Sequence, residues 1–235
     1  MYGMVNGIMN IAIRATTDVE TPAVFLAASI IRQLESGKKV LWFATGGSSI
    51  AVVIEAAKII GKQSHGGLCR NLHITLTDER YGPLGHADSN WQQMIDKGFN
   101  LPDAKLIHIL TGRDIVETTK TFNAILRTEL AEMTYKIGLF GIGADGHTAG
   151  ILPGSGAIDS ECLAYSYATP QFERITITLE VIDKLDEAVV FMQGKQKWHI
   201  IEDLQKDIKV SQQPAQILKV VPVLTIFTDY TSSRA

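Results

Sequence analysis

The segment at residues 136–150, KIGLFGIGADGHTAG, decides how this chain is interpreted, because an apolar run leads directly into a glycine-rich turn. The apolar residues 136–141 are typical of a buried strand, and the glycines that follow allow a sharp turn close to a ligand. Asp145 and His147 lie two residues apart on this turn. Asp145 can orient the ring of His147, or the two can converge separately on one substrate, and histidine suits proton transfer near neutral pH. We therefore expect catalytic chemistry at Asp145 and His147.

The same turn also matches GxGxxG, the glycine pattern of dinucleotide-binding sites. Such a site needs the motif to open a full helix, with an acidic residue about twenty positions further on for the ribose. Pro153 interrupts any helix here, and Asp159, Glu161 and Glu173 do not clearly end a second strand. We therefore expect no nucleotide cofactor. A plain glycine turn with a solvated histidine is the other alternative, and further polar clusters after other predicted strands weigh against it.

Strand-like and helix-like stretches alternate on both sides of this segment. The helix-like stretches include residues 17–34 and 48–60, which are amphipathic or rich in alanine and isoleucine. The predicted strands are residues 39–44, 72–77, 106–110, 136–141, 175–179, 187–192 and 223–228. This alternation predicts an α/β fold, with a mostly parallel, open, Rossmann-like sheet flanked by helices on both faces. In such a sheet, ligands bind at the carboxyl ends of the strands.

The composition is that of an ordinary globular chain. At 235 residues, 46% hydrophobic and 20% charged, it is consistent with a single domain over residues 1–235. The net charge of −3 provides no general nucleic-acid surface, and no run approaches the roughly eighteen apolar residues of a membrane span. Residues 1–14 lack the pattern of a signal peptide, so we expect a cytoplasmic protein, monomeric or homodimeric. Cys69 and Cys162 lack metal-ligand spacing, and we expect no metal site.

A second polar loop, ATGGSSI at residues 44–50, joins a predicted strand to a predicted helix. Gly46, Gly47 and Ser48 could present backbone amides and a hydroxyl to a phosphate at the helix N-terminus. The loop could equally be a tight turn in which Ser48 caps the helix. It lacks the lysine of a P-loop, which argues against binding of a nucleoside triphosphate.

A third polar loop, TDERYGPLGHADSN at residues 77–90, also follows a predicted strand. Three consecutive charges, Asp78 to Arg80, are unusual for a purely structural turn. At its other end, Asp88 or Ser89 is expected to cap the next helix, and a cap does not exclude a functional role. Loops of this kind at strand ends are where ligand-binding residues concentrate.

Together these blocks resemble the 6-phosphogluconolactonase family, which belongs to a wider group with the glucosamine-6-phosphate deaminases. The matching blocks, in the family's order, are GGSS at 46–49, DERYGP at 78–83, DSN at 88–90, GIGADGHTA at 141–149, PG at 153–154, RITIT at 174–178 and GKQK at 194–197. DER and GHTA resemble the lactonase branch, since deaminases typically carry DEY and GHIAFNEP. The chain departs from the usual lactonase pattern at Ile50, Gly82, Gly150 and Leu152, and Gly150 removes a serine hydroxyl.

The resemblance implies a hydrolase that opens 6-phospho-D-glucono-1,5-lactone to 6-phospho-D-gluconate in the oxidative pentose phosphate pathway. His147 would deprotonate the attacking water and return the proton to the ring oxygen, while Asp145 would hold or polarise the site. The residues implied in holding the substrate and its phosphate are Gly46, Gly47, Ser48, Asp78, Arg80, Asn90, Arg174 and Lys197. No metal is required, because the ester is already activated.

Several alternatives stay open at this point. Arg174 could be a generic strand arginine, and Lys197 could lie on a solvated helix face. An amino-sugar phosphate deaminase or isomerase would use the same scaffold and phosphate pocket. A non-catalytic sugar-phosphate sensor would need the cations but no general base, so the presence of both Asp145 and His147 favours an enzyme.

Overall fold

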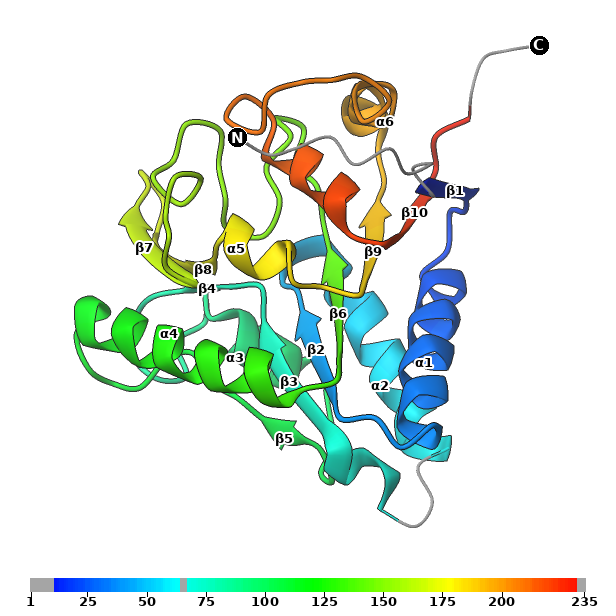
Figure 1. The fold of residues 1–235 in the computed structure, drawn as a ribbon, viewed down its shortest axis with the longest axis vertical. Helices are drawn as coiled ribbons and strands as arrows, with labels where there is room; N and C mark the ends of the chain where they lie inside the picture. The colour runs from blue at the N-terminus through cyan, green and yellow to red at the C-terminus, as the bar shows by residue number, and fades with distance from the viewer. Residues whose placement is uncertain (1–10, 64–66, 232–235) are drawn as a thin grey trace.

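The computed structural model, which describes residues 11–63 and 67–231, contains a seven-stranded parallel sheet and a separate three-stranded antiparallel sheet (Figure 1). In spatial order the large sheet consists of β1 (Ile11–Ala15), β10 (Val223–Thr228), β9 (Glu187–Met192), β6 (Tyr135–Phe140), β2 (Val40–Ala44), β3 (Leu72–Leu76) and β5 (Lys105–Leu106). The small sheet consists of β4 (Asp78–Arg80), β8 (Glu173–Ile177) and β7 (Ala164–Ala168).

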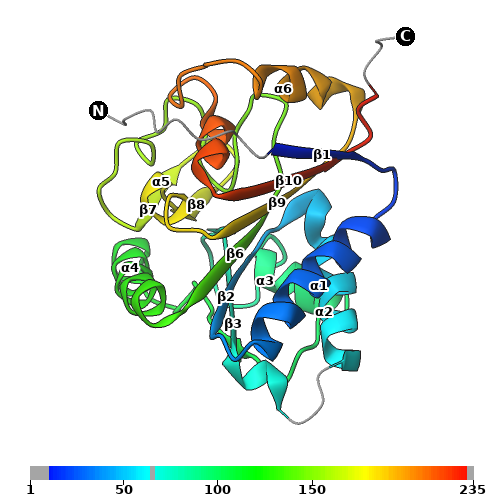
Figure 2. The same cartoon turned by 45° about the vertical axis from the view of Figure 1, so that its right-hand side comes forward.

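Helices cover both faces of the large sheet. The α-helices are α1 (Glu20–Glu35), α2 (Ile50–Gln63), α3 (Asn90–Asp96), α4 (Ile115–Glu132), α5 (Leu179–Ile182) and α6 (Trp198–Asp203). Short 3-10 helices are η1 (Gly47–Ser49), η2 (Leu68–Asn71), η3 (Lys195–Lys197) and η4 (Pro214–Val220). Figure 2 shows α1 and α2 on one face of the sheet and α4 on the other. The predicted α/β class is therefore confirmed.

The central strands are buried along their whole length, which explains why they are continuous apolar runs. All five residues of β2 are buried, including Trp42 and Phe43, and all six of β9 are buried as well. A parallel sheet with helices on both faces removes both sides of each strand from water. Burying a side chain of this size stabilises the fold by roughly 1.5–3 kcal/mol.

Two predicted strands differ from the structure. Residues 175–179 do not join the parallel sheet, because Ile175 lies in β8, which pairs antiparallel with β4 and β7, and Leu179 begins α5. The strand predicted at 106–110 extends only over Lys105–Leu106, where β5 pairs with β3 at the edge of the sheet. An apolar run favours a strand but does not specify its partner, which depends on tertiary packing.

The order of the strands creates a switch point at the centre of the sheet. β2 and β6 are neighbours, yet the chain leaves β2 through α2 toward β3 and leaves β6 toward β9, on the opposite side. The loops after the two strands therefore diverge and leave a crevice at their carboxyl ends. These are the loops that contain GGSS and GIGADGHTA.

The expectations of no membrane span, a single domain and no signal peptide have different outcomes. Among the helices of the described residues, none combines the length and apolar character that spanning a bilayer requires. A single domain over residues 1–235 stays a prediction. The segment examined for a signal peptide lies largely outside the described residues, which begin at Ile11.

Candidate active site

The crevice at the switch point is a cavity of about 330 Å³. It is lined by Thr45, Gly46, Gly47, Ser48, Ser49, Asp78, Arg80, Asn90, Gly141, Ile142, Gly143, His147, Ala149, Arg174 and Lys197. Every predicted substrate-binding residue is in this lining, and so is His147. Asp145 is not, and it reaches the cavity through its contact with His147.

Asp145 and His147 form a hydrogen-bonded pair. The Oδ1 atom of Asp145 lies 2.6 Å from Nδ1 of the His147 ring and also accepts the backbone N–H of His147 at 3.2 Å. Burial raises the pKa of Asp145, but the hydrogen bonds and charge of His147 outweigh it and keep that pKa below its usual value. The carboxylate is therefore ionised at neutral pH and accepts Nδ1–H, which leaves Nε2 as the basic nitrogen of the ring.

Glycines make this pairing possible. A Cβ atom on Gly143 would lie 2.2 Å from Nδ1 of His147 and 2.6 Å from Oδ1 of Asp145, so a side chain there would occupy the place of the pair. The backbone N–H of Gly143 donates to the His147 carbonyl, and that of Gly146 donates to the Gly143 carbonyl, each at 3.0 Å. The loop is thus closed by its own backbone.

A segment distant in sequence, which contains Gln213 and Ala215, packs against the same loop. Gly146 has a left-handed φ of 77°, and a Cβ atom there would lie 2.3 Å from Cγ of Gln213. The carbonyl of Gly146 accepts the backbone N–H of Ala215 at 2.9 Å. Gln213 and Ala215 were not identifiable from the sequence, because no local pattern links residues almost seventy positions away to this turn.

The structure gives no support to a dinucleotide-binding turn. After Gly141 the chain forms turns and isolated bridges, including those joining Thr148 to Ile142 and to Ile151. No helix occurs between residue 141 and the start of α5 at Leu179. Within GxGxxG, Gly143 makes room for the Asp145–His147 pair and Gly146 for Gln213, and neither opens a helix.

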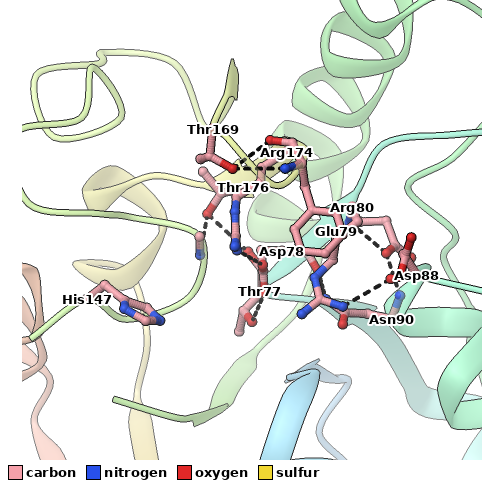
Figure 3. Close-up of polar contacts among 12 residues, drawn as sticks. Thr77, Asp78, Glu79, Arg80, Asp88, Asn90, His147, Thr169, Arg174 and Thr176 are labelled. Carbon is pink, nitrogen blue, oxygen red and sulfur yellow. Dashed lines mark hydrogen bonds and ion pairs between the residues drawn. The ribbon is translucent and has the colours of Figure 1, made fainter. Parts of the chain in front are cut away.

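Two arginines, Arg80 and Arg174, form the cationic side of the cavity (Figure 3). Nη1 of Arg174 lies 3.4 Å from Oδ2 of Asp78, and Nη1 of Arg80 donates to the Asp88 carbonyl at 3.0 Å. The Nε atoms of both arginines are buried without a hydrogen-bond partner among the described residues. Burial raises the pKa of Asp78, and Arg174, Arg80 and His147 oppose that rise only in part. Unpartnered buried donors of this kind favour an incoming anion.

Glu79, the middle charge of the DER block, has a structural task. Its buried carboxylate accepts the backbone N–H groups of Arg80, Asn90 and Trp91 at 2.8, 2.6 and 3.1 Å, and the Ser89 hydroxyl at 3.0 Å. Burial raises the pKa of Glu79, and these hydrogen bonds offset the rise in part. Glu79 therefore fastens the start of α3 to β4. Ser89 caps α3 as predicted, since its hydroxyl accepts the N–H of Gln92.

Asn90 faces the cavity from the first turn of α3. Its Nδ2 donates to the Asp78 carbonyl at 2.9 Å, while its Oδ1 is buried and has no hydrogen-bond partner among the described residues. A Cβ atom on Gly46 would lie 2.0 Å from this Oδ1. The glycine in the first block therefore makes room for Asn90. Ser48 lines the cavity and lies inside η1, whose N-cap position is Gly46.

Lys197 reaches the cavity from η3, at the carboxyl end of β9. Burial lowers its pKa, and Asp229 opposes that effect in part. The Asp229 carboxylate also accepts the backbone N–H of Gly194 at 3.0 Å and the indole N–H of Trp198 at 3.0 Å. Asp229 thus anchors the loop that carries Lys197. Lys197 is half-buried, so it does not lie on a solvated helix face.

The described residues contain no group of three or more histidines, cysteines, aspartates or glutamates placed to hold a metal ion. The ionisable residues of the cavity are instead three cations, Arg80, Arg174 and Lys197, with one carboxylate, Asp78, and His147. The site therefore has a local positive surplus within a chain of net charge −3.

Comparisons with known proteins show the family of this chain. Residues 18–225 match the family model described as glucosamine-6-phosphate isomerases/6-phosphogluconolactonase. The 6-phosphogluconolactonase of Borreliella burgdorferi is 27% identical over 173 residues, which are 68% of this chain and 73% of that protein. The 6-phosphogluconolactonase of Chlamydia pneumoniae is 25% identical over 132 residues, 54% of this chain and 50% of that protein. The match thus spans half the length of the Chlamydia relative.

Solved structures share the fold. The 6-phosphogluconolactonase from Plasmodium vivax superposes with a TM-score of 0.78 at 18% identity, covering 97% of this chain and 94% of that one. The enzyme of the same name from Thermotoga maritima gives a TM-score of 0.74 at 18% identity, with 93% and 99% covered.

Proposed function

The chain belongs to the family of glucosamine-6-phosphate isomerases and 6-phosphogluconolactonases, and we propose that it hydrolyses 6-phospho-D-glucono-1,5-lactone to 6-phospho-D-gluconate. One observation carries the proposal: the Asp145–His147 pair and the arginines Arg80 and Arg174 serve the same cavity of about 330 Å³. A base and an anion site close together are what hydrolysis of a phosphorylated lactone needs. The names of the matched relatives support the same activity.

His147 acts as the base in this proposal. Its Nδ1–H is held by Asp145 at 2.6 Å, so Nε2 takes a proton from water as the water oxygen attacks C1 of the lactone. The ionised Asp145 stabilises the imidazolium that results. When the bond between C1 and the ring oxygen breaks, the imidazolium returns the proton to that oxygen. The products are the open-chain hydroxyl and the carboxylic acid, which then ionises.

The phosphate binds at the cationic side. Arg80 and Arg174 supply forked donors, including the buried Nε atoms, and Lys197 adds a point charge. Asp78 does not contact the phosphate in this scheme, since a carboxylate there would repel it. It holds Arg174 in place through the contact of 3.4 Å.

The sugar ring lies between the base and the cations. Asn90 lines the cavity on this side, held by its hydrogen bond to the Asp78 carbonyl and packed against Gly46, and forms part of the wall that the ring contacts. The amides of Gly46 and Gly47 and the hydroxyl of Ser48, on the next loop, are close enough to the same cavity to contact the substrate. The proposal also places the enzyme in the cytoplasm, as a monomer or a homodimer. Light scattering of the purified protein tests the oligomeric state.

The deciding experiment measures hydrolysis of freshly generated 6-phosphoglucono-1,5-lactone by the purified protein, with spontaneous opening subtracted. The His147→Asn variant should lose about 10²–10⁴-fold in kcat, the range expected for removal of a general base. His199→Asn is the matched control, because His199 is exposed on α6 and lies outside the cavity lining. Ammonia release from glucosamine 6-phosphate without lactone hydrolysis would replace this proposal with a deaminase. Binding of phosphorylated sugars without turnover of either would indicate a sensor.

A further inference from the structure

Phe172, outside all the sequence blocks, contacts both arginines of the site. The centre of its ring lies 5.3 Å from the guanidinium carbon of Arg80 and 5.9 Å from that of Arg174. We propose that Phe172 is a positioning residue, whose ring orients the two guanidinium groups for the substrate phosphate. This inference rests on the proposed function, because it concerns the phosphate side of the same cavity.

The pairing of the strands explains why such a residue is needed. Arg80 on β4 and Arg174 on β8 are directly opposite each other in the antiparallel register. Like charges at directly opposed positions repel and destabilise the sheet. Phe172 directly precedes β8, two residues before Arg174, and the distances from its ring to both guanidinium groups put the ring on the same side as the two arginines. An aromatic face attracts a cation within about 6 Å of the ring centre, so one ring offsets part of the repulsion on both sides.

Hydrogen bonds alone leave the two guanidinium groups loosely fixed. Arg174 has a long contact of 3.4 Å to Asp78, and Arg80 donates to a backbone carbonyl, that of Asp88. Both Nε atoms are buried without a partner among the described residues. The ring therefore supplies an orientation that these contacts do not, while leaving the N–H donors available to an anion.

Phe172 is itself held firmly. The hydroxyl of Thr169 accepts the backbone N–H of Phe172 at 3.0 Å and donates to its carbonyl at 2.8 Å. The backbone N–H of Thr169 donates to the same carbonyl at 2.8 Å. This closed turn between β7 and β8 fixes the backbone from which the ring projects, so the ring can act as a rigid support (Figure 3 shows Thr169 beside Arg174).

The experiment compares Phe172→Leu and Phe172→Tyr with the unmodified protein, on 6-phosphoglucono-1,5-lactone and on unphosphorylated glucono-1,5-lactone. In Phe172→Leu the KM for the phosphorylated substrate should rise about 5- to 20-fold while kcat stays within about twofold, because the cation–π attraction to two arginines is lost. Phe172→Tyr keeps an aromatic face and should remain close to the unmodified protein. Hydrolysis of the unphosphorylated lactone should be equal in all three.

The matched control is Phe25→Leu. Phe25 lies under Arg14, with 4.8 Å between the guanidinium carbon and the ring centre, and neither residue lines the cavity. This variant loses a comparable contact and should leave KM unchanged. A fall in kcat without a rise in KM, or equal losses in Phe172→Leu and Phe172→Tyr, would overturn the positioning role.

Titration with inorganic phosphate by calorimetry separates this inference from the proposed function. Phe172→Leu should bind phosphate more weakly than the unmodified protein, whether or not the lactone is the substrate. If the protein hydrolyses no lactone but shows this difference, the proposed function fails and the role of Phe172 stands. If the unmodified protein binds no phosphate, or both proteins bind it equally, the inference is refuted.

Discussion

Replacing Gly146 by alanine should destabilise the protein far more than the same change at a comparable glycine. Gly146 adopts a φ of 77°, and a Cβ atom there would lie 2.3 Å from Cγ of the buried Gln213. Gly154 has a similar φ of 70°, but a Cβ atom there would meet nothing within 4 Å. Gly154→Ala therefore measures only the cost of a left-handed backbone at a residue with a Cβ atom. That conformation costs about 1–2 kcal/mol, and the lower conformational entropy of the unfolded alanine chain offsets part of it, so the net loss should be about 1 kcal/mol.

The additional loss at Gly146 comes from moving Gln213. Its Nε2 donates to Asp203 at 3.1 Å, and its Oε1 accepts from Gln216. Each hydrogen bond that is disturbed costs about 1 kcal/mol, and overpacking costs about 1–3 kcal/mol. The free energy of unfolding should therefore fall by about 3–5 kcal/mol in Gly146→Ala, which is a large part of a typical 5–15 kcal/mol. The turn would also shift the Asp145–His147 pair, so kcat should fall about 10²-fold.

Urea unfolding of a double-mutant cycle tests this explanation. Gln213→Ala removes the atom that the new methyl group would strike, so Gly146→Ala in that background should cost only slightly more than Gly154→Ala. The coupling between the two positions, the difference between these two losses, should then be about 2–4 kcal/mol. If the two losses simply add to within about 0.5 kcal/mol, the proposed clash does not exist and the reasoning is wrong.

Three further changes probe two carboxylates, Asp145 and Asp78, and Gly150, one of the positions at which the chain departs from the usual lactonase pattern. Asp145→Asn should lower kcat about 10²-fold or more with little change in KM, because the amide no longer stabilises the His147 imidazolium, and an unchanged kcat would exclude that role. Burial raises the pKa of Asp78 in the folded state, so the contribution of this group to stability is greatest at low pH and declines as pH rises from the ordinary aspartate pKa of about 3.9 to the raised pKa. In Asp78→Asn, urea unfolding above about pH 4 should lose this part of the decline, and a steeper decline would contradict the sign. Gly150→Ser should destabilise the protein by about 1–3 kcal/mol, although many lactonases carry serine there, because its Cβ would lie 2.8 Å from Cβ of Thr176. An unchanged melting temperature would show that β8 shifts to make room for the side chain.

Much of the fold was predictable because its signals are local. Continuous apolar runs mark the buried parallel strands, and the alternation of strands and helices indicates the class. The strand at 175–179 shows the limit: its apolar character predicted a strand, but its antiparallel partners β4 and β7 depend on contacts across the fold. The edge strand β1 was not predicted, since its apolar run is only three residues long and most of its residues are exposed.

The site shows the same division. The sequence blocks predicted the residues that line the cavity, because glycines, an aspartate–histidine turn and clustered charges after strands are visible without a structure. The sequence left open whether Asp145 orients His147 or acts separately, and whether the Lys197 side chain lies on a solvated helix face. The first depends on how the turn at residues 141–150 folds, and the second on how the loop after β9 packs against its neighbours, and the structure shows both.

The sequence by itself determined the family and the α/β class, and it located the proposed base, its carboxylate and the cations, because each of these signals lies in a short contiguous block. The structure alone decided how they cooperate. Glu79 fastens α3, Gln213 supports the catalytic turn, Asp229 anchors Lys197 and Phe172 contacts two opposed arginines. These four residues act through contacts with distant parts of the chain, and such contacts arise only when burial and strand pairing bring the segments together.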